Sequence, residues 1–269
     1  MVTKPEQFGR FRIASAEESA AYGYCILVYS RGGGGKTTLA GSADDSPEDS
    51  PVLFIDAEGG TKAISHRPNV QVINVDKWPD IKELANTIIQ APDPLPWRTI
   101  VLDNLSEFIQ LATSHIVGNA TDQVSQPKYG EMAREVLALV RAFRDLGRHR
   151  GVNIILIAWD STEFDETKRL ISTINATPKL QKDLPGIVDI IGYISPIDNQ
   201  PDKRLLSFEP SSRTVAKFRR NTSGAARTIP HSIVYGLDNL PMPDILAALK
   251  RGVTWPASKY PRPTNSNGR

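Results

Sequence analysis

A run of four glycines followed by lysine and threonine restricts this chain more than any other feature of its sequence. The segment reads Ser30, Arg31, Gly32, Gly33, Gly34, Gly35, Lys36, Thr37 and Thr38, and it follows an apolar run at residues 25–29. Glycine tolerates positive φ and lets successive backbone N–H groups turn toward a phosphate, where a side chain would clash. We therefore predict a strand, a phosphate-binding loop and a helix, with Lys36 reaching the β- and γ-phosphates of ATP and Thr37 ligating Mg²⁺. The helix N-terminus would add its partial positive charge to the site.

The loop departs from the usual spacing at one position. That spacing places a glycine six residues before the lysine, where this chain has Ser30. A flexible glycine linker that happens to precede Lys36 and Thr37 is the alternative interpretation. The apolar strand before the loop, the helix after it and an acidic strand end later in the chain favour the phosphate loop.

Composition points to a single α/β core with short extensions. The chain has 269 residues, 40% hydrophobic and 23% charged, and a formal net charge of +2, so any basic surface must be local. Its single cysteine, Cys25, lies in an apolar run and is expected to be a buried small hydrophobe, which favours a reducing, cytoplasmic location. The sequence has neither the pattern of a signal peptide nor an apolar stretch long enough for a membrane span, so we expect no membrane partner.

Short β-branched runs alternate with helical patterns along the chain. This alternation predicts an α/β fold with a mostly parallel central sheet flanked by helices. The expected strands are residues 25–29, 52–56, 70–75, 99–103 and 153–158, and the expected helices are residues 36–42, 80–90, 105–117 and 129–149. Most of these strands are apolar on both faces, as central strands covered by helices require.

The pattern changes after Asp160. Residues 161–186 are polar, charged and weakly periodic, and we expect a long functional or mobile loop there. Antiparallel strands are expected at residues 188–195, 204–208 and 214–218. We divide the chain into an N-terminal extension that is a candidate oligomerisation segment (1–21), a core (22–250) and a flexible basic tail (251–269).

The apolar strand at residues 99–103 delivers a carboxylate at its C-terminal edge, where open α/β sheets bind ligands. Asp103 would hold Mg²⁺ through water, in the manner of a Walker B acid. The alternative is a helix cap, since residues 104–107 are able to start a helix. Because Asn104 rather than glutamate follows Asp103, the base that activates water must come from elsewhere in the chain.

The strand at residues 52–56 is followed by a second candidate carboxylate, Glu58. We expect this strand to neighbour the phosphate-loop strand and to place Glu58 near the γ-phosphate. Glu58 is then the candidate catalytic base, which orients and deprotonates the attacking water. A solvated turn acid is the alternative. Asp56 points to the opposite side of the strand and Glu107 lies one helical turn beyond Asp103, so both are weaker candidates.

Four segments together resemble the phage-encoded RecA-like ATPases, especially the Sak group of core-only single-strand annealing recombinases. They are GKTTLA at 35–40, FIDAEGGT at 54–61, VLDNLSE at 101–107 and YG at 129–130, and the resemblance spans residues 22–235. It implies a RecA-like P-loop core, ATP hydrolysis with Mg²⁺, binding of single-stranded DNA and head-to-tail self-assembly into a filament or ring. RecA shares the FIDAE stretch, whose glutamate is its catalytic base, and this supports Glu58.

The same resemblance assigns a sensor and two DNA-facing loops. In that family a polar residue after the strand at 153–158 senses the γ-phosphate and couples it to a DNA-binding loop. This chain has Trp159 and Asp160 instead of the family's histidine or glutamine, and Asp160, Ser161 or Thr162 is the candidate substitute. Segments 118–128 and 161–186 would face single-stranded DNA, with a solvated, mobile loop as the alternative for the second.

Residues 203–227 carry seven basic side chains and one acidic side chain. Such a cluster would neutralise phosphates. Lys217 and Arg219 share one face of a strand and its exit, and they resemble the paired basic residues by which RecA-like subunits complete each other's ATP sites, a catalytic role in trans. A solvated charge cluster is the alternative. Phe8 and Phe11 are a candidate aromatic peg between subunits, or a staple on the protomer's own surface.

We therefore predict an ATP- and Mg²⁺-dependent phage recombinase or annealing protein that binds single-stranded DNA and hydrolyses ATP to regulate its assembly. A single-strand-binding protein is a candidate further partner. A helicase or helicase loader on the same core and a nucleotide-dependent protein switch are the alternatives. GTP specificity is disfavoured because no Asn-Lys-x-Asp box occurs, and a small-molecule kinase would need an arginine-rich lid that we do not find.

Overall fold

The computed structural model describes residues 7–9, 11–13, 22–118, 126–164, 168, 170–218 and 229–260. The strands of its main sheet are β3 (Cys25–Ser30), β4 (Val52–Asp56), β5 (Val70–Asn74), β6 (Thr99–Asp103), β7 (Asn153–Phe164), β8 (Leu170–Ile174), β9 (Ile190–Ile197), β10 (Gln200–Ser207), β11 (Lys217–Phe218) and β12 (Ser232–Gly236). The α-helices are α2 (Lys36–Gly41), α3 (Trp78–Gln90), α4 (Leu105–Ile116), α5 (Gln126–Arg150), α6 (Pro178–Ile187) and α7 (Met242–Arg251). Two 3₁₀ turns, η1 (Ser42–Asp45) and η2 (Gly60–Ile64), follow α2 and β4.

The strands form one sheet in the order β12-β10-β9-β3-β7-β6-β4-β5, with β11 paired to β9 and β8 paired to β7. The pairs from β9 through β3, β7, β6 and β4 to β5 are parallel, whereas β10, β11, β12 and β8 pair antiparallel. The predicted α/β class, with a mostly parallel central sheet and antiparallel C-terminal strands, is confirmed. The phosphate-loop strand β3 and the strand β6 that carries Asp103 are separated by β7.

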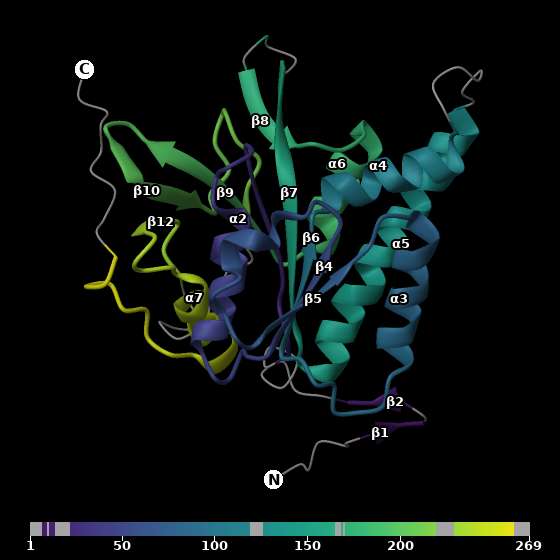
Figure 1. The fold of residues 1–269 in the computed structure, drawn as a ribbon, viewed down its shortest axis with the longest axis horizontal. Helices are drawn as coiled ribbons and strands as arrows, with labels where there is room; N and C mark the ends of the chain where they lie inside the picture. The colour runs from purple at the N-terminus through teal and green to yellow at the C-terminus, as the bar shows by residue number, and fades with distance from the viewer. Residues whose placement is uncertain are drawn as a thin grey trace.

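Helices cover both faces of the sheet (Figure 1). Helices α3, α4, α5 and α6 contribute to an apolar cluster with one set of strand side chains, including Leu27 and Leu156. Helices α2 and α7 contribute to a second cluster with the alternate set, including Val28 and Ile157. Because side chains alternate along a strand, a strand covered on both faces needs an unbroken apolar run, and this explains the sequence pattern of the central strands.

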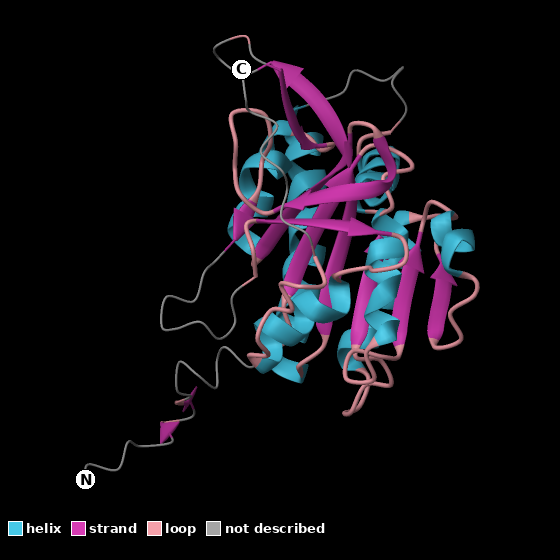
Figure 2. Ribbon diagram, turned by 90° about the vertical axis from the view of Figure 1, so that its left-hand side faces the viewer, coloured by secondary structure: helices cyan, strands magenta, loops and turns pink. Residues whose placement is uncertain are grey.

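The expected long loop at residues 161–186 is wrong. Strand β7 continues to Phe164 and forms an antiparallel hairpin with β8, and α6 follows. Figures 1 and 2 show this hairpin extending beyond the end of the other strands. The segment is ordered because Ile174, Leu180 and Leu184 are buried against the core. These three apolar residues stand among polar ones, so the sequence of the segment shows only weak periodicity.

The C-terminal part of the core also extends further than expected. Strand β12 and helix α7 were not among the predicted elements. In addition, residues up to Tyr260, which were assigned to a flexible tail, pack against α7. Trp255 stacks on Tyr260 with ring centroids 4.9 Å apart, and the Tyr260 hydroxyl donates a hydrogen bond to Asp244 at 2.5 Å. Tyr260 is buried, so the boundary at residue 251 is too early, while residues 261–269 lie outside the described part.

Near the N-terminus, β1 (Gln7–Phe8) and β2 (Phe11–Arg12) pair antiparallel in a ladder of their own. The side chains of Phe8 and Phe11 lie outside what the structure describes, so the aromatic peg stays a prediction. Within the described ranges, no helix has both the length and the apolar character that crossing a membrane requires.

Candidate functional site

The glycine loop joins the end of β3 to the start of α2, and its geometry explains its composition. Gly33 and Gly35 have φ values of 72° and 87°, in the left-handed region that favours glycine. A Cβ at Gly34 would lie 2.1 Å from the hydroxyl oxygen of Ser30. Glycine is therefore required at these three positions by conformation or by space, which a flexible linker would not require.

Ser30, the departure from the usual spacing, belongs to the wall of this loop. It is buried, and its hydroxyl donates a hydrogen bond to the carbonyl oxygen of Arg31 at 2.9 Å. The ammonium of Lys36 donates to the Ser30 carbonyl at 3.1 Å and to the Ser30 hydroxyl at 3.3 Å. Serine at this position is thus compatible with the loop, and it gives the lysine an additional oxygen contact.

Lys36 is a buried cation among carboxylates. Its side chain begins in the first turn of α2, and the residue is 6% exposed. Burial lowers the pKa of Lys36, and the charges of Glu58, Asp103 and Asp160 act in the opposite direction. The structure therefore gathers these three carboxylates, from three separate segments, within electrostatic range of one lysine.

Thr37 and Asp103 meet where the metal was predicted. The Thr37 hydroxyl donates a hydrogen bond to Asp103 Oδ2 at 2.8 Å, and Asp103 is fully buried at the end of β6. Its other carboxylate oxygen, Oδ1, is buried with no hydrogen-bond partner among the described residues. Burial raises the pKa of Asp103 to about 7, with smaller contributions from neighbouring carboxylates, while the Thr37 hydrogen bond opposes the rise.

These oxygens fit Mg²⁺. A buried unpaired carboxylate oxygen beside a hydroxyl supplies the hard ligands that Mg²⁺ prefers, and this ion is usually held by one or two protein groups together with phosphates. Among the described residues, no group of three or more histidine, cysteine, aspartate or glutamate side chains is placed to hold a metal without such help. The donor set is therefore suited to an ion shared with a nucleotide.

Glu58 reaches the site by another route than expected. Its strand β4 does not neighbour β3, because β7 and β6 lie between them, so that expectation was wrong. Strands β3, β6 and β4 end at the same edge, which β7 passes on its way into the hairpin, and Asp56 at the end of β4 stands in register with Asp103. Glu58, two residues further, is exposed, yet its charge acts on both Lys36 and Asp103.

The Asp56 carboxylate stabilises the turn that follows β4. Its carboxylate accepts hydrogen bonds from the backbone N–H groups of Glu58 and Gly59 at 2.9 and 2.8 Å, and from the Thr61 hydroxyl at 2.8 Å. These three hydrogen bonds hold the backbone of residues 58–61 in one conformation after β4. Asp56 therefore supports the position of Glu58 and is not placed to act on a ligand itself.

Two residues that sequence reasoning did not assign to the site hold the Glu58 carboxylate. The side-chain amide of Asn104 donates to Glu58 Oε2, and the indole N–H of Trp159 donates to Glu58 Oε1 at 3.2 Å. Asn104 also caps α4, since its Oδ1 accepts a hydrogen bond from the Glu107 backbone N–H at 2.7 Å. The helix cap considered for Asp103 is therefore Asn104, and the Asn-x-x-Glu spacing was its sequence signal.

Asp160 lies beside the phosphate loop, because β7 neighbours β3 and Ser30 stands in register with Trp159. The Asp160 side chain is 7% exposed, its carboxylate lies 3.9 Å from the Arg31 guanidinium, and it accepts a hydrogen bond from the Tyr193 hydroxyl at 3.4 Å. The Arg31 side chain is 80% exposed, so this ion pair contributes little. The role of Asp160 as a phosphate sensor stays a prediction.

Lys217 lies elsewhere in the protomer. It is on β11, which pairs with the beginning of β9, and its ammonium donates to the backbone carbonyls of Pro185 and Val188, the latter at 2.7 Å. These carbonyls lie at the C-terminal end of α6, so within its own chain Lys217 completes a helix terminus. Arg219 lies outside the described residues, as do residues 119–125 of the first predicted DNA-facing loop. The catalytic role of Lys217 and Arg219 in trans stays a prediction.

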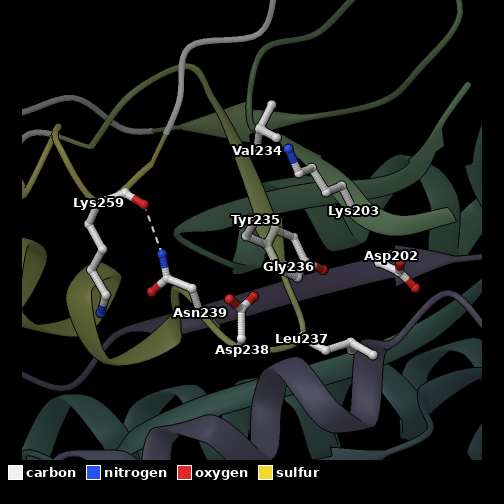
Figure 3. A pocket seen from close by; sticks show the side chains of 9 residues that line it. All are labelled: Asp202, Lys203, Val234, Tyr235, Gly236, Leu237, Asp238, Asn239 and Lys259. Atoms are coloured by element: carbon white, nitrogen blue, oxygen red, sulfur yellow. Dashed lines mark hydrogen bonds between the residues drawn. The ribbon is translucent and has the colours of Figure 1, made fainter. Parts of the chain in front are cut away.

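A hollow of about 480 Å³ lies on the antiparallel half of the sheet (Figure 3). Its lining residues are Asp202, Lys203, Val234, Tyr235, Gly236, Leu237, Asp238, Asn239 and Lys259. Its two lysines are balanced by two aspartates, and Lys259 already pairs with Asp244 at 2.7 Å. Neither of its lysines follows a glycine loop at a strand end, as Lys36 does, so the glycine loop is the better candidate for a phosphate site.

A strand, a conformationally required glycine loop, a buried lysine and a buried aspartate on a second strand define a P-loop nucleotide-binding protein. The similarity to known proteins narrows this class. The chain belongs to the AAA domain family, whose model matches residues 22–220, and it therefore carries a P-loop ATPase domain.

Two further comparisons add little to this assignment. No curated protein matches the chain. Among solved structures it is similar to the crystal structure of the RadB recombinase, with 15% identity and a TM-score of 0.45, over 70% of this chain and 80% of the other. The assignment accordingly depends on the family match and on the site geometry.

Proposed function

We propose that this chain is an ATP-dependent, single-stranded-DNA-binding recombinase or annealing protein of a phage, RecA-like in its core. It hydrolyses ATP to regulate its own assembly on DNA, as a head-to-tail filament or ring. A single-strand-binding protein is a candidate partner. The resemblance of residues 54–61 and 101–107 to RecA-like phage ATPases supports this proposal.

The catalytic residues have distinct roles in this proposal. Backbone N–H groups of the loop and the Lys36 ammonium bind the β- and γ-phosphates, while Thr37 and Asp103 hold Mg²⁺, which when bound neutralises phosphate charge. Glu58 takes the proton of the attacking water, because its carboxylate lies at the same sheet edge as Lys36 and Asp103. Asn104 and Trp159 orient Glu58 through their N–H groups.

The observation that carries the DNA part of the proposal is the β7–β8 hairpin. It leaves the sheet directly beside the phosphate loop, within the segment expected to face single-stranded DNA. Phe164 and Leu170 pair across the two strands and are 72% and 55% exposed. An exposed aromatic side chain offers a surface on which a base stacks.

Filter binding and annealing of complementary oligonucleotides test this function, with and without ATP. Lys36→Ala is expected to reduce ATP turnover by about 10²- to 10³-fold, because it removes a buried donor aimed at the transferring phosphate. It is also expected to abolish nucleotide-dependent DNA retention. Lys77→Ala, which removes an exposed lysine next to α3, is the matched control and should behave as wild type.

Two results would overturn the proposal. If wild-type protein retains no single strand in a nucleotide-dependent way, the recombinase function is lost. Flat, weak binding across a salt titration would favour a nucleotide-dependent protein switch, since phosphate contacts make binding fall steeply with salt. Directional unwinding of a duplex would favour the helicase.

A further inference from the structure

The carboxylate of Glu58 is held by two side-chain hydrogen bonds. The residue is exposed, so packing restricts its rotamers less than it restricts those of a core residue. Its two oxygens each accept one side-chain hydrogen bond, Oε2 from Asn104 and Oε1 from the indole N–H of Trp159. A long acidic side chain in solvent samples several rotamers, so these two donors select the one that faces the site.

Trp159 is itself fixed at the base of the β7–β8 hairpin. Its backbone N–H donates to the hydroxyl of Ser106 at 3.0 Å, and its carbonyl accepts from the Asn175 N–H at 2.8 Å. The same Ser106 hydroxyl donates to the Asn175 carbonyl at 3.1 Å. Ser106 is buried in the first turn of α4, three residues after Asp103. The backbone of Trp159 is therefore fastened both to β6–α4 and to the end of β8.

We propose that Trp159 is a positioning residue, which orients the Glu58 carboxylate through its indole N–H and couples that orientation to the β7–β8 hairpin. This inference rests on the proposed function, because it takes Glu58 as the base in ATP hydrolysis. A displacement of the hairpin that moves the indole withdraws one of the two donors that orient the carboxylate. Trp159 then governs the rate of the chemical step and leaves the affinity for ATP unchanged.

The steady-state test uses the full chain and removes the N–H alone. Trp159→Phe keeps an aromatic ring but has no donor, and it is expected to lower kcat by about tenfold with KM for ATP changed less than about twofold, since Asn104 still holds the other oxygen. Trp97→Phe is the matched control. This change removes an indole N–H that donates to Gln71 at 2.9 Å. Gln71 lies near the beginning of β5, the last strand of the sheet, so both constants should be unchanged.

A spectroscopic readout separates positioning from a loss of structure. The emission of Trp159 is obtained by subtracting the spectrum of Trp159→Phe from that of wild type. The same subtraction in a Glu58→Ala background is expected to give a shifted emission maximum, because the indole N–H has lost its carboxylate acceptor. Glu107→Gln removes a neighbouring carboxylate that does not bond to the indole, and should leave the Trp159 spectrum unchanged.

Each outcome decides the inference. Wild-type kcat in Trp159→Phe, or a Trp159 spectrum that is the same with and without Glu58, overturns it. A fall in kcat accompanied by an equal rise in KM also overturns it, because that pattern indicates a lost binding site. If wild-type protein does not hydrolyse ATP, the proposed function fails, and the emission comparison still decides whether the indole holds Glu58.

Discussion

The two ends of the parallel strands each bury an aspartate completely, and the two are used in opposite ways. At the end where the strands begin, Asp49 accepts from the Arg251 guanidinium at 3.0 and 3.1 Å and from the Asn153 amide at 3.0 Å. At the end where the strands finish, the Asp103 carboxylate accepts from Thr37 through Oδ2, and its Oδ1 has no partner among the described residues. Burial alone therefore does not mark a functional acid, whereas burial with unused bonding capacity does.

The difference has a physical cause in the parallel fold. Strands that run in one direction place all their C-terminal ends, and the turns after them, along a single edge. Asp103, Glu58 and the phosphate loop are gathered there, and each is left with oxygen or N–H groups available to a ligand. At the other edge, Asp49 and Arg251 connect α7 to the base of the sheet, where the pairing of both Asp49 oxygens stabilises the fold.

The largest expected effect is at the C-terminal edge. Glu58→Gln keeps the shape of the side chain but cannot take a proton, so kcat should fall by about 10²- to 10⁴-fold with nucleotide affinity retained. Stopped-flow turnover and equilibrium titration with a fluorescent nucleotide measure the two quantities. Glu83→Gln, on helix α3, is the control. Unchanged turnover in Glu58→Gln would remove Glu58 as the base.

At the N-terminal edge, the expected effect is on stability. Arg251→Met leaves the fully buried Asp49 charge with Asn153 as its remaining side-chain donor, and the free energy of unfolding should fall by about 3–5 kcal/mol. Urea unfolding followed by circular dichroism measures this loss, and turnover per folded molecule should not change. Arg144→Met breaks the partly exposed pair with Asp145 and should cost less than about 1 kcal/mol. Similar losses in both variants would contradict the comparison.

Asp103 should also make the stability of the ligand-free protein depend on pH. The pKa of Asp103 is raised from its ordinary 3.8 to about 7 in the folded state, so the folded state binds the extra proton and stability falls as pH rises between these values. Asp103→Asn should remove that dependence and raise the free energy of unfolding at pH 8 by about 2–4 kcal/mol. Urea titrations at pH 5 and pH 8, with chelator and without nucleotide, measure it. A variant less stable than wild type at pH 8 would be the contrary result.

The smallest expected effect concerns the antiparallel half. Lys217→Met removes two hydrogen bonds to carbonyls at the end of α6 and should lower the free energy of unfolding by about 1–2 kcal/mol. Lys203→Met, at an exposed position of β10, is the control for charge. ATP turnover measured over a range of protein concentrations completes the test. A loss of turnover that appears only where subunits associate would assign Lys217 the role in trans that the sequence predicted.

Local sequence patterns were sufficient for the central strands and for the phosphate loop. Strands 52–56 and 99–103 were predicted with the observed bounds, because strands covered on both faces need continuous apolar runs. The hairpin and α6 were missed because their buried residues, Ile174, Leu180 and Leu184, are few and widely spaced among polar ones. The core was ended too early, at residue 250, because the burial of Tyr260 depends on a distant partner, Asp244.

By itself, the sequence determined that glycines precede Lys36 and Thr37 after an apolar strand, and that Asp103 ends another such strand. Conformational freedom and hydrophobicity are local properties, so neighbouring residues reveal them. Only the tertiary structure decided that β7 and β6 stand between β3 and β4, and that Asn104 and Trp159 hold Glu58. Strand order and side-chain hydrogen bonds join residues far apart in the chain, and their formation depends on how the whole sheet packs.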